Sequence, residues 1–321
     1  MDDLIADTLK RIYADHAEDT TGLWQALEEN GLSRAWVPEK LGGTGLELAD
    51  GFALIRQSAG ESASVPFAET LMAGYLLSLT GAEVPDGQIT VAMASSNTTI
   101  QAPFTDSAEH ILHLSENNLE LFKTENATAI VGVGSDPLGS LNLDQLTAVS
   151  THKTPAWLTP DVYQQLGAII RSAQQCGAMQ YQLELTLEHT SMREQFGRPL
   201  TKFQAIQHLL AEMAGELASS SAALEGALQS VSFDCAPDAI AIACAKTRAG
   251  EAADTVSKHA HQAHGAIGYT GEYSLGRFSR RLWQWRNDFG NEFYWSKRLG
   301  EAFSRSNSGG LTEDIFGAIN G

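Results

Sequence analysis

The second half of the chain carries a long helical pattern that limits the possible folds more than any other feature. Residues 159–161 (Thr-Pro-Asp) are typical of a helix start, since they combine an N-cap residue, a proline at the first helical position and an acid in the first turn. Apolar residues then recur at helical spacing, and two further long helical runs follow, one after Thr201 and one from Pro237 to about Gly265. Three long amphipathic helices with a fourth behind them predict an antiparallel four-helix bundle.

Two smaller units are expected ahead of this bundle. Residues 1–84 show helical spacing, and we interpret the glycine-rich segment 42–45 as a turn, because no lysine follows it at P-loop spacing. Between 88 and 152, short β-prone runs alternate with turn-forming residues. We therefore expect a mostly α-helical protein with an N-terminal helical domain (1–84), a reduced antiparallel middle β-domain (85–155) and a C-terminal four-helix bundle (156–321).

The charge balance limits the partners. The chain has 39 acidic and 21 basic residues, a formal net charge of −18, which disfavours binding to nucleic acid or to an anionic membrane. No apolar run approaches the roughly 20 residues of a membrane span, and the acidic start at residues 1–3 does not resemble a signal peptide. We expect a cytoplasmic protein, in which any phosphate site needs a local basic cluster. One stretch offers such a cluster: Arg277, Arg280, Arg281 and Arg286.

The residue types that often carry chemistry give few signals. His261 and His264 share a helix face with His259 nearby, but no carboxylate or cysteine completes a metal-binding set, so we expect no metal site. The motifs of a nucleophile elbow and of a dinucleotide-binding turn are both missing. The cysteines have neither disulfide nor metal spacing, and we interpret them as buried thiols: Cys176, Cys235 and Cys244.

One helix junction has the residues of a nucleotide site. Residues 192–208 predict a helix, a break at Gly197 and Pro199, and a second helix with Thr201 and Gln204 as a capping box. The first helix ends at Arg193, a planar fork suited to phosphate, and Phe196 adds a flat apolar face. Taken alone, this stretch fits an ordinary helix hairpin better than a ligand site.

A second stretch changes that interpretation. Residues 262–270 (Gln-Ala-His-Gly-Ala-Ile-Gly-Tyr-Thr) end a helix on glycines and lead into the arginine-rich segment 276–283. Together, the two stretches resemble the acyl-CoA dehydrogenase family of flavoproteins, which has an arginine before Phe-Gly, a later Phe-Gln, and then Gln-x-x-Gly-Gly-x-Gly-Tyr. The run at 31–45 is also similar to the N-terminal helical domain of that family. The resemblance covers most of residues 20–85 and 158–305.

The resemblance implies a role in binding FAD. In the family, the motif arginine and phenylalanine contact the FAD of the neighbouring subunit, and they match Arg193 and Phe196 here. The following glutamine matches Gln204, and the later glutamine and glycine match Gln262 and Gly265, near the adenosine and pyrophosphate end of the cofactor. The sequence departs mildly from the pattern at position 266, where alanine replaces the usual second glycine.

The same resemblance implies that the catalytic machinery is incomplete. The Thr-Glu-Pro-type and Trp-Ile-Thr/Ser segments, which hold the flavin ring in the family, are absent between 85 and 155. The catalytic glutamate of the family precedes a glycine that matches Gly290, so its position holds Phe289 here. The alternative glutamate position falls on Gly167. Neither residue can accept a proton.

Two other acids are possible bases. Asp288 is one residue before the matched position, which on a helix is a rotation of about 100° and aims the side chain elsewhere. We interpret it as a solvated acid, or as one paired with arginines of the cluster (Arg280, Arg281, Arg286). Glu272 is a weaker candidate.

The matches and departures together imply the smaller, base-lacking subunit of a heteromeric acyl-CoA dehydrogenase of the steroid side-chain type. Such enzymes are heterotetramers with two copies of each subunit, in which a longer homologue supplies the base and the flavin pocket. The implied reaction is α,β-dehydrogenation of an acyl-CoA in lipid metabolism and steroid degradation, with hydride transfer to FAD. Two alternatives remain: a self-sufficient homo-oligomer with Asp288 as base, and a non-catalytic structural or regulatory homologue.

Overall fold

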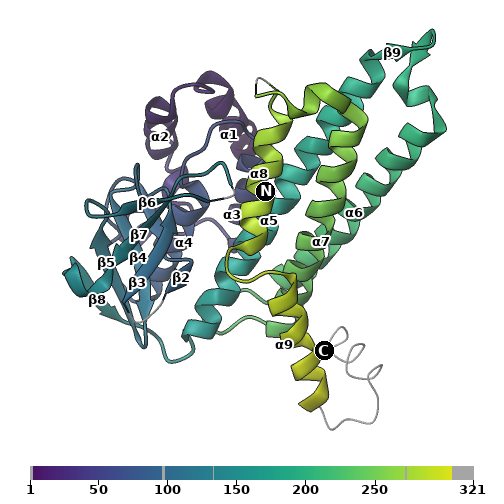
Figure 1. Cartoon of the computed structure of the whole chain (residues 1–321). Coiled ribbons are helices and arrows are strands. Elements are labelled where there is room, and N and C mark those ends of the chain that lie inside the picture. Colours follow the sequence, from purple (N-terminus) through teal and green to yellow (C-terminus); the bar gives the residue numbers. More distant parts are fainter. Residues whose placement is uncertain (1–2, 96–97, 133, 272, 306–321) are drawn as a thin grey trace.

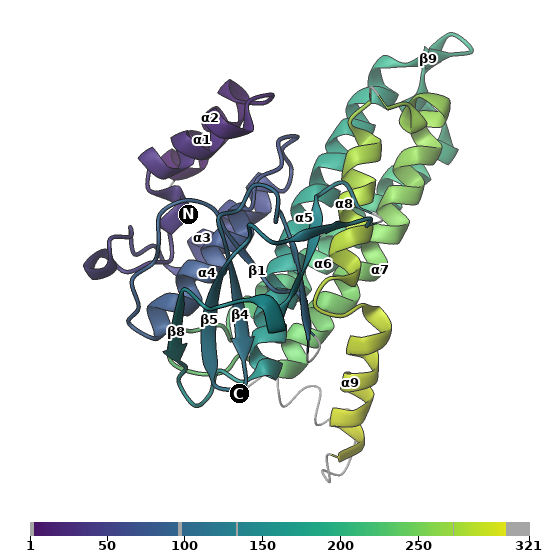
Figure 2. The same cartoon turned by 60° about the vertical axis from the view of Figure 1, so that its left-hand side comes forward.

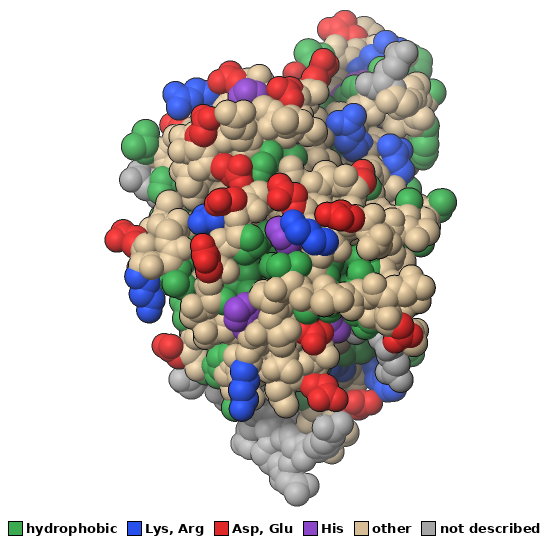
Figure 3. Space-filling model, turned by 90° about the vertical axis from the view of Figure 1, so that its left-hand side faces the viewer, with side chains coloured by type: hydrophobic (Ala, Val, Ile, Leu, Met, Phe, Trp, Pro, Cys, Tyr) green, Lys and Arg blue, Asp and Glu red, His purple; other side chains and the backbone are tan. Residues whose placement is uncertain are grey.

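The computed structural model describes residues 3–95, 98–132, 134–271 and 273–305. Four helices and two short 3-10 turns form the N-terminal part: α1 (Asp3–Asp15), α2 (Thr20–Glu29), η1 (Leu32–Arg34), η2 (Glu39–Leu41), α3 (Leu48–Ser58) and α4 (Phe67–Leu79). α4 is buried over nearly its whole length, because it lies between the strands that follow and the long helices of the second half. The acidic side chains expected from the net charge are spread over the outer face of this half of the molecule (Figure 3).

The middle part contains two small sheets. The first has the order β1-β4-β5-β8 and is built from β1 (Ile89–Val91), β4 (His110–Ser115), β5 (Asn118–Lys123) and β8 (Ser150–Lys153). The second has the order β2-β3-β7-β6 and is built from β2 (Ala94–Ser95), β3 (Thr99–Pro103), β7 (Leu138–Asn142) and β6 (Thr128–Ile130), with the short turn η3 (Leu143–Gln145) after β7. β4, β5 and β8 lie next to one another in Figure 2.

One strand pairing differs from the predicted antiparallel arrangement. β1 pairs with β4 in parallel, since the chain passes through the second sheet before it returns, whereas the other pairings are antiparallel. The sequences of β7 and β8 favour a strand only weakly, because Leu-Gly-Ser-Leu-Asn and Ser-Thr-His-Lys lack the β-branched and aromatic alternation of a strand. They are strands because each has a neighbouring strand to pair with.

The second half of the chain is helical, as expected. It contains α5 (Pro160–Met192), a small hairpin of β9 (Glu194–Gln195) and β10 (Arg198–Pro199), η4 (Leu200–Lys202), α6 (Gln204–Leu228), α7 (Ala239–His264), η5 (Gly265–Tyr269), α8 (Leu275–Asn287) and α9 (Glu292–Arg305). α5, α6, α7 and α8 pack side by side, and α9 projects past one end of the bundle (Figures 1 and 2). The predicted fold class is confirmed: a mostly helical chain with a small sheet region in its middle.

Local signals placed some helix ends correctly and others wrongly. Thr159 caps α5 as predicted, accepting a hydrogen bond from the Val162 amide at 3.3 Å. The prediction of a capping box at Thr201 is wrong, because this residue lies in η4. α6 begins only at Gln204 and has no side-chain cap. α7 begins after Asp238, whose carboxylate accepts from two backbone amides, rather than at Pro237.

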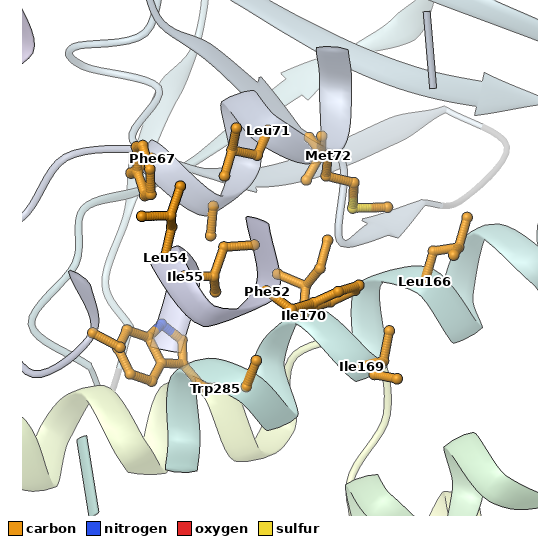
Figure 4. Packing of buried hydrophobic residues seen from close by; sticks show 14 of the residues in the cluster. Phe52, Leu54, Ile55, Phe67, Leu71, Met72, Leu166, Ile169, Ile170 and Trp285 are labelled. Atoms are coloured by element: carbon orange, nitrogen blue, oxygen red, sulfur yellow. The ribbon is translucent and has the colours of Figure 1, made fainter. Parts of the chain in front are cut away.

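A continuous hydrophobic core joins the N-terminal helices to the bundle. Figure 4 shows side chains of α3 and α4 packed against α5 and against Trp285 of α8. α5 and α3 approach closely at Gly177, where an added Cβ would lie 1.8 Å from the carbonyl oxygen of Arg56. Within the described ranges, no helix is both long and apolar enough to cross a membrane.

The close approach of α5 and α3 gives a first prediction. Gly177→Ala should lower the free energy of unfolding by about 1–3 kcal/mol, because backbone must move to admit the methyl group. The control is Gly215→Ala on α6, where nothing lies within 4 Å of the added Cβ, and which should stabilise the helix by about 0.5–1 kcal/mol. Urea unfolding measures both. Equal stability of the two variants would contradict the packing described here.

Candidate functional site

The far end of the bundle, where α5 turns into α6, is built around a short hairpin. α5 ends at Met192, and the amide of the next residue, Arg193, donates to the carbonyl of His189. β9 and β10 then fold back, so that the amide of Leu200 donates to the Arg193 carbonyl. The hairpin therefore projects from the end of the bundle (Figure 1). Its turn contains Phe196 at φ 51° and Gly197 at φ 76°.

The two residues expected to touch a cofactor are exposed in this hairpin. Phe196 is 92% exposed and holds a backbone conformation that costs a non-glycine residue about 1 kcal/mol or more. Arg193 is also exposed. Phe203 lies beneath the hairpin, edge-on to Phe196, with the guanidinium of Arg198 4.2 Å from its ring centroid. The hairpin thus holds an exposed aromatic ring and an exposed guanidinium on a supported loop.

The other three expected cofactor residues lie at the starts and ends of helices at the same end of the bundle. Gln204 is the exposed first residue of α6, and Gln262 is exposed in the last turn of α7. Gly265 has φ 65° and ψ −141°, a combination that belongs essentially to glycine, and nothing lies within 4 Å of where its Cβ would be. The glycine is therefore needed for its backbone conformation, and it leaves main chain bare at the surface.

Ring stacking connects the two motifs. The imidazole of His189 on α5 stacks on that of His264 on α7, with the centroids 4.4 Å apart. Around this junction several large apolar side chains are exposed to solvent, namely Leu187, Met192, Phe196, Ile267 and Tyr269. The stack therefore places the end of α5 next to the end of α7, although the two motifs lie about 70 residues apart in the sequence, and each segment exposes large apolar side chains.

The arginine cluster does not form the phosphate site that the sequence suggested. Arg281 is buried, and it donates to the carbonyls of Glu61 and Ser62 and pairs with Asp136. Arg277 also donates to the Ser62 carbonyl, and Arg286 pairs with Glu292 at 2.6 Å. These contacts hold α8 against other parts of the fold, and of the four arginines Arg277 and Arg280 are exposed.

A buried cluster of charges, which the sequence analysis missed, lies where α4, α5, α7 and α8 meet. Arg171 of α5 is 1% exposed, and its guanidinium contacts the carboxylate of Glu69 at 2.5 Å and that of Asp288 at 2.9 Å. Lys246 of α7 donates to the carbonyls of Trp285 and Arg286 at the end of α8. The signal that could have revealed the cluster was an arginine and a lysine on helix faces that are otherwise apolar.

This cluster corrects the prediction for Asp288. The residue is 8% exposed rather than solvated, and its partner is Arg171 rather than an arginine of the cluster on α8. Burial raises the pKa of its carboxyl group, while the positive charges of Arg171 and Lys246 lower it. Burial also lowers the pKa of Lys246. Glu272, the other acid considered, lies outside the described residues.

Phe289 fills the space beside Gly167. The Phe289 ring is buried edge-on to Tyr163, and a Cβ added at Gly167 would lie 2.2 Å from this ring. Phe289 has φ 55°, and its carbonyl accepts hydrogen bonds from Gln164 and from the Trp295 indole. The two positions that the resemblance matched to a catalytic glutamate are therefore in contact. The Phe289 ring occupies the space that a side chain at position 167 would need.

The histidines and cysteines make other contacts. His261 contacts the Ser279 hydroxyl at 2.8 Å, and His264 is hydrogen-bonded to the Ala260 carbonyl and to the hydroxyl of Tyr273. Among the described residues, no group of three histidine, cysteine or acidic side chains could hold a metal ion. The prediction that the cysteines are buried is correct for Cys176 and wrong for Cys235 and Cys244, which are exposed thiols.

Comparison with known proteins relates this architecture to one family. Residues 165–283 match the family described as "Acyl-CoA dehydrogenase, C-terminal domain". The chain is 28% identical over 262 residues to "Acyl-CoA dehydrogenase IpdE2" of Mycobacterium tuberculosis, a match that covers 81% of this chain and 79% of the relative. It is 40% identical to "3-sulfinopropanoyl-CoA desulfinase" of Paraburkholderia xenovorans, over only 32% of this chain and 26% of the relative.

Solved structures have the same fold. The structure described as "Tcur3481-Tcur3483 steroid ACAD G363A variant" superposes with a TM-score of 0.82 at 24% identity, covering 94% of this chain and 97% of the other. The ChsE4-ChsE5 complex of Mycobacterium tuberculosis gives a TM-score of 0.81 at 22% identity, covering 95% and 98%. At these identities, the likeness establishes the fold alone.

The buried charges give a second prediction. Arg171→Met should lower the free energy of unfolding by about 3–5 kcal/mol, because Glu69 and Asp288 would remain buried without their partner. The loss should be smaller at pH 5 than at pH 8. Without Arg171, burial raises the pKa of Asp288 in the folded variant above its value in the unfolded chain. The free energy of unfolding of the variant therefore falls as the pH rises.

The matched control for this variant is Lys297→Met, which breaks an exposed pair with Glu301 on α9 and should change stability by about 0.5 kcal/mol or less. Urea unfolding at the two pH values measures both variants. A loss in Arg171→Met no larger than that of the control would show that the buried cluster contributes little to stability.

Proposed function

Because this chain belongs to the acyl-CoA dehydrogenase family, we propose that it is the smaller, base-lacking subunit of a heteromeric acyl-CoA dehydrogenase. Family members are FAD-dependent oxidoreductases that act on CH–CH bonds. The reaction is α,β-dehydrogenation of an acyl-CoA thioester, for which bound FAD supplies the hydride acceptor. In this proposal, the chain contributes residues to an FAD site that it shares with a longer homologous partner. The partner supplies the rest of the site and the catalytic base.

The observation that carries the proposal is the contact between Phe289 and Gly167. Neither residue has a group that can accept a proton, and the ring occupies the space in which a side chain at position 167 would begin. The acid that precedes Phe289 in the sequence, Asp288, is buried, and its carboxylate is engaged in an ion pair with Arg171. For Asp288 to act as a base, its ion pair with Arg171 would have to break.

The exposed end of the bundle fits the cofactor part of the proposal. A guanidinium can bind a pyrophosphate through two parallel hydrogen bonds, and Arg193 is exposed and available for this role. The bare main chain at Gly265 permits close approach of a phosphate, with Gln262 beside it as an amide donor. Phe196 offers an apolar face, and Gln204 a further amide. These residues face outward, as a site completed by another chain requires.

The partner and substrate class follow from the same reasoning. Two proteins with the same fold are described as a complex of two named chains and as a steroid acyl-CoA dehydrogenase with a paired name. By analogy with them, the partner is a longer acyl-CoA dehydrogenase homologue in a heterotetramer, and the substrate is a steroid side-chain CoA thioester. The exposed apolar side chains around the hairpin are the surface on which we expect that partner to pack.

Purification alone and with the partner tests the proposal. The chain alone should be colourless, whereas the chain co-expressed with its longer homologue should form a yellow complex that oxidises a steroid side-chain CoA thioester with a dye as electron acceptor. The absorbance spectrum gives the flavin content of each sample. Strong FAD binding by the lone chain would contradict the division of the site, and an assembled complex without turnover would favour a structural or regulatory role.

Substitution of Arg193 tests whether this chain contributes to the FAD site. In the complex, Arg193→Ala should weaken FAD binding by about 2–5 kcal/mol, because the phosphate charge would lose its buried partner. Arg11→Ala, which alters an exposed arginine of α1 far from the bundle end, is the control and should retain the flavin. Flavin content after gel filtration distinguishes the two variants. If Arg193→Ala retains as much flavin as the control, the assignment of Arg193 is wrong.

A further inference from the structure

The proposed cofactor surface is assembled from two separate segments whose relative position must be fixed. One is the end of α5 with Arg193, and the other is the end of α7 with Gln262 and Gly265. The His189–His264 stack is a direct side-chain link between these ends, with the ring planes 21° apart. His264 lies immediately before Gly265, so the position of its ring determines where the following main chain begins.

In the neutral form of His264, the hydrogen bonds define which ring nitrogen carries the proton. Nδ1 lies 2.8 Å from the carbonyl oxygen of Ala260, which can only accept, so Nδ1 carries the proton. Nε2 is then an acceptor for the hydroxyl of Tyr273 at 3.0 Å. The neutral ring is therefore held by α5 through stacking, by its own helix through Nδ1, and by the segment after η5 through Nε2.

We propose that His264, with His189 and Tyr273, is a positioning group that holds the Gly265 segment in register with Arg193, so that both reach the same FAD. This inference rests on the proposed function. His264 itself touches no cofactor in this scheme, since its ring lies beneath the exposed segment. A second stack, of His261 on Tyr269 with His261 bonded to Ser279, fixes the other end of η5 against α8.

The surroundings of His264 favour its neutral form. The titratable and charged groups around the stack are His189, Glu188 and Arg193 on α5, His261 on α7, and Tyr273 beside Tyr181. Burial, followed by the two neighbouring histidines, lowers the pKa of His264 to about 4, although its bond to the Ala260 carbonyl raises it. Burial and then Arg193 lower the pKa of His189.

The lowered pKa of His264 determines how the positioning of this segment depends on pH. The unfolded histidine takes up a proton near its ordinary pKa of about 6.5, whereas folded His264 does so only near pH 4. The stabilising contribution of the neutral ring is therefore complete above about pH 6.5 and is lost as the pH falls towards 4. Protonation at Nε2 would also oppose the bond that Tyr273 donates. Flavin should accordingly leave the complex in acid as this segment loosens.

Tyr273→Phe in the assembled complex tests the inference, since it keeps the ring and removes only the hydroxyl that stabilises neutral His264. The pH at which half of the flavin is lost should rise by about one unit. Hydrogen exchange of residues 262–271 should become about fivefold faster, as expected for the loss of one hydrogen bond. The matched control is Tyr294→Phe, which removes a hydroxyl bonded to Gln164 and Arg298 on α9 and should change neither quantity.

His264→Phe separates positioning from general stability. A ring that cannot be protonated should remove the acid-induced step in flavin loss, whereas a merely structural role would lower flavin content equally at every pH.

Flavin and exchange curves of Tyr273→Phe that coincide with those of the control overturn the inference. If Arg193→Ala depletes flavin while Tyr273→Phe does not, only this inference fails. If Arg193→Ala retains flavin, the assignment of Arg193 to the FAD site fails, and the exchange of residues 262–271 still decides whether Tyr273 fixes the segment.

Discussion

The buried guanidinium of Arg171 is the interaction on which most of this architecture depends. Removing such a charge from water costs several kcal/mol, and the cost is tolerable only because Glu69 and Asp288 contact it directly. Glu69 belongs to α4 and Asp288 ends α8, so one side chain of α5 fixes the N-terminal helices and the end of the bundle relative to each other. Lys246 adds a second buried charge that caps the carbonyls at the end of α8. Two carboxylates thus lie close to one guanidinium and one amine in this cluster, so the buried ionisable groups have partners of opposite charge.

The cluster also places Phe289. This residue follows Asp288, and its left-handed backbone is held by the ion pair on one side and by the bonds to its carbonyl on the other. A strained conformation of this kind persists only when the surrounding structure determines it from several directions. The Phe289 ring and the ion pairs beside it fill this part of the interior. At the opposite end of α5, Arg193 and the nearby Phe196 are exposed. The two positions matched to a catalytic base are therefore buried and filled, whereas the opposite end of α5 is exposed.

Much of the fold could be predicted from the sequence, because the signals involved are local. The N-cap at Thr159 and the end of α7 at Gly265 each depend on a few adjacent residues. Predictions that depended on distant partners failed. β7 and β8 have weak strand patterns and exist through their neighbours, and the arginines of α8 bind carbonyls and an acid from residues 61–136, so they are not free for a phosphate. The capping box at Thr201 failed for a related reason, since the hairpin before it delays the start of α6.

The sequence by itself determined the helical second half, the small β-region before it and the two motifs of the candidate cofactor site, together with the absence of a carboxylate at the matched base positions. Periodicity, caps and residue identity carry that information without reference to the rest of the chain. Only the tertiary structure decided that the helix ends with the two motifs lie next to each other, that Asp288 is paired with Arg171, and that the Phe289 ring occupies the space at Gly167. Each of these facts joins residues tens to more than a hundred positions apart, and such contacts are set by how whole helices pack, which no local pattern records.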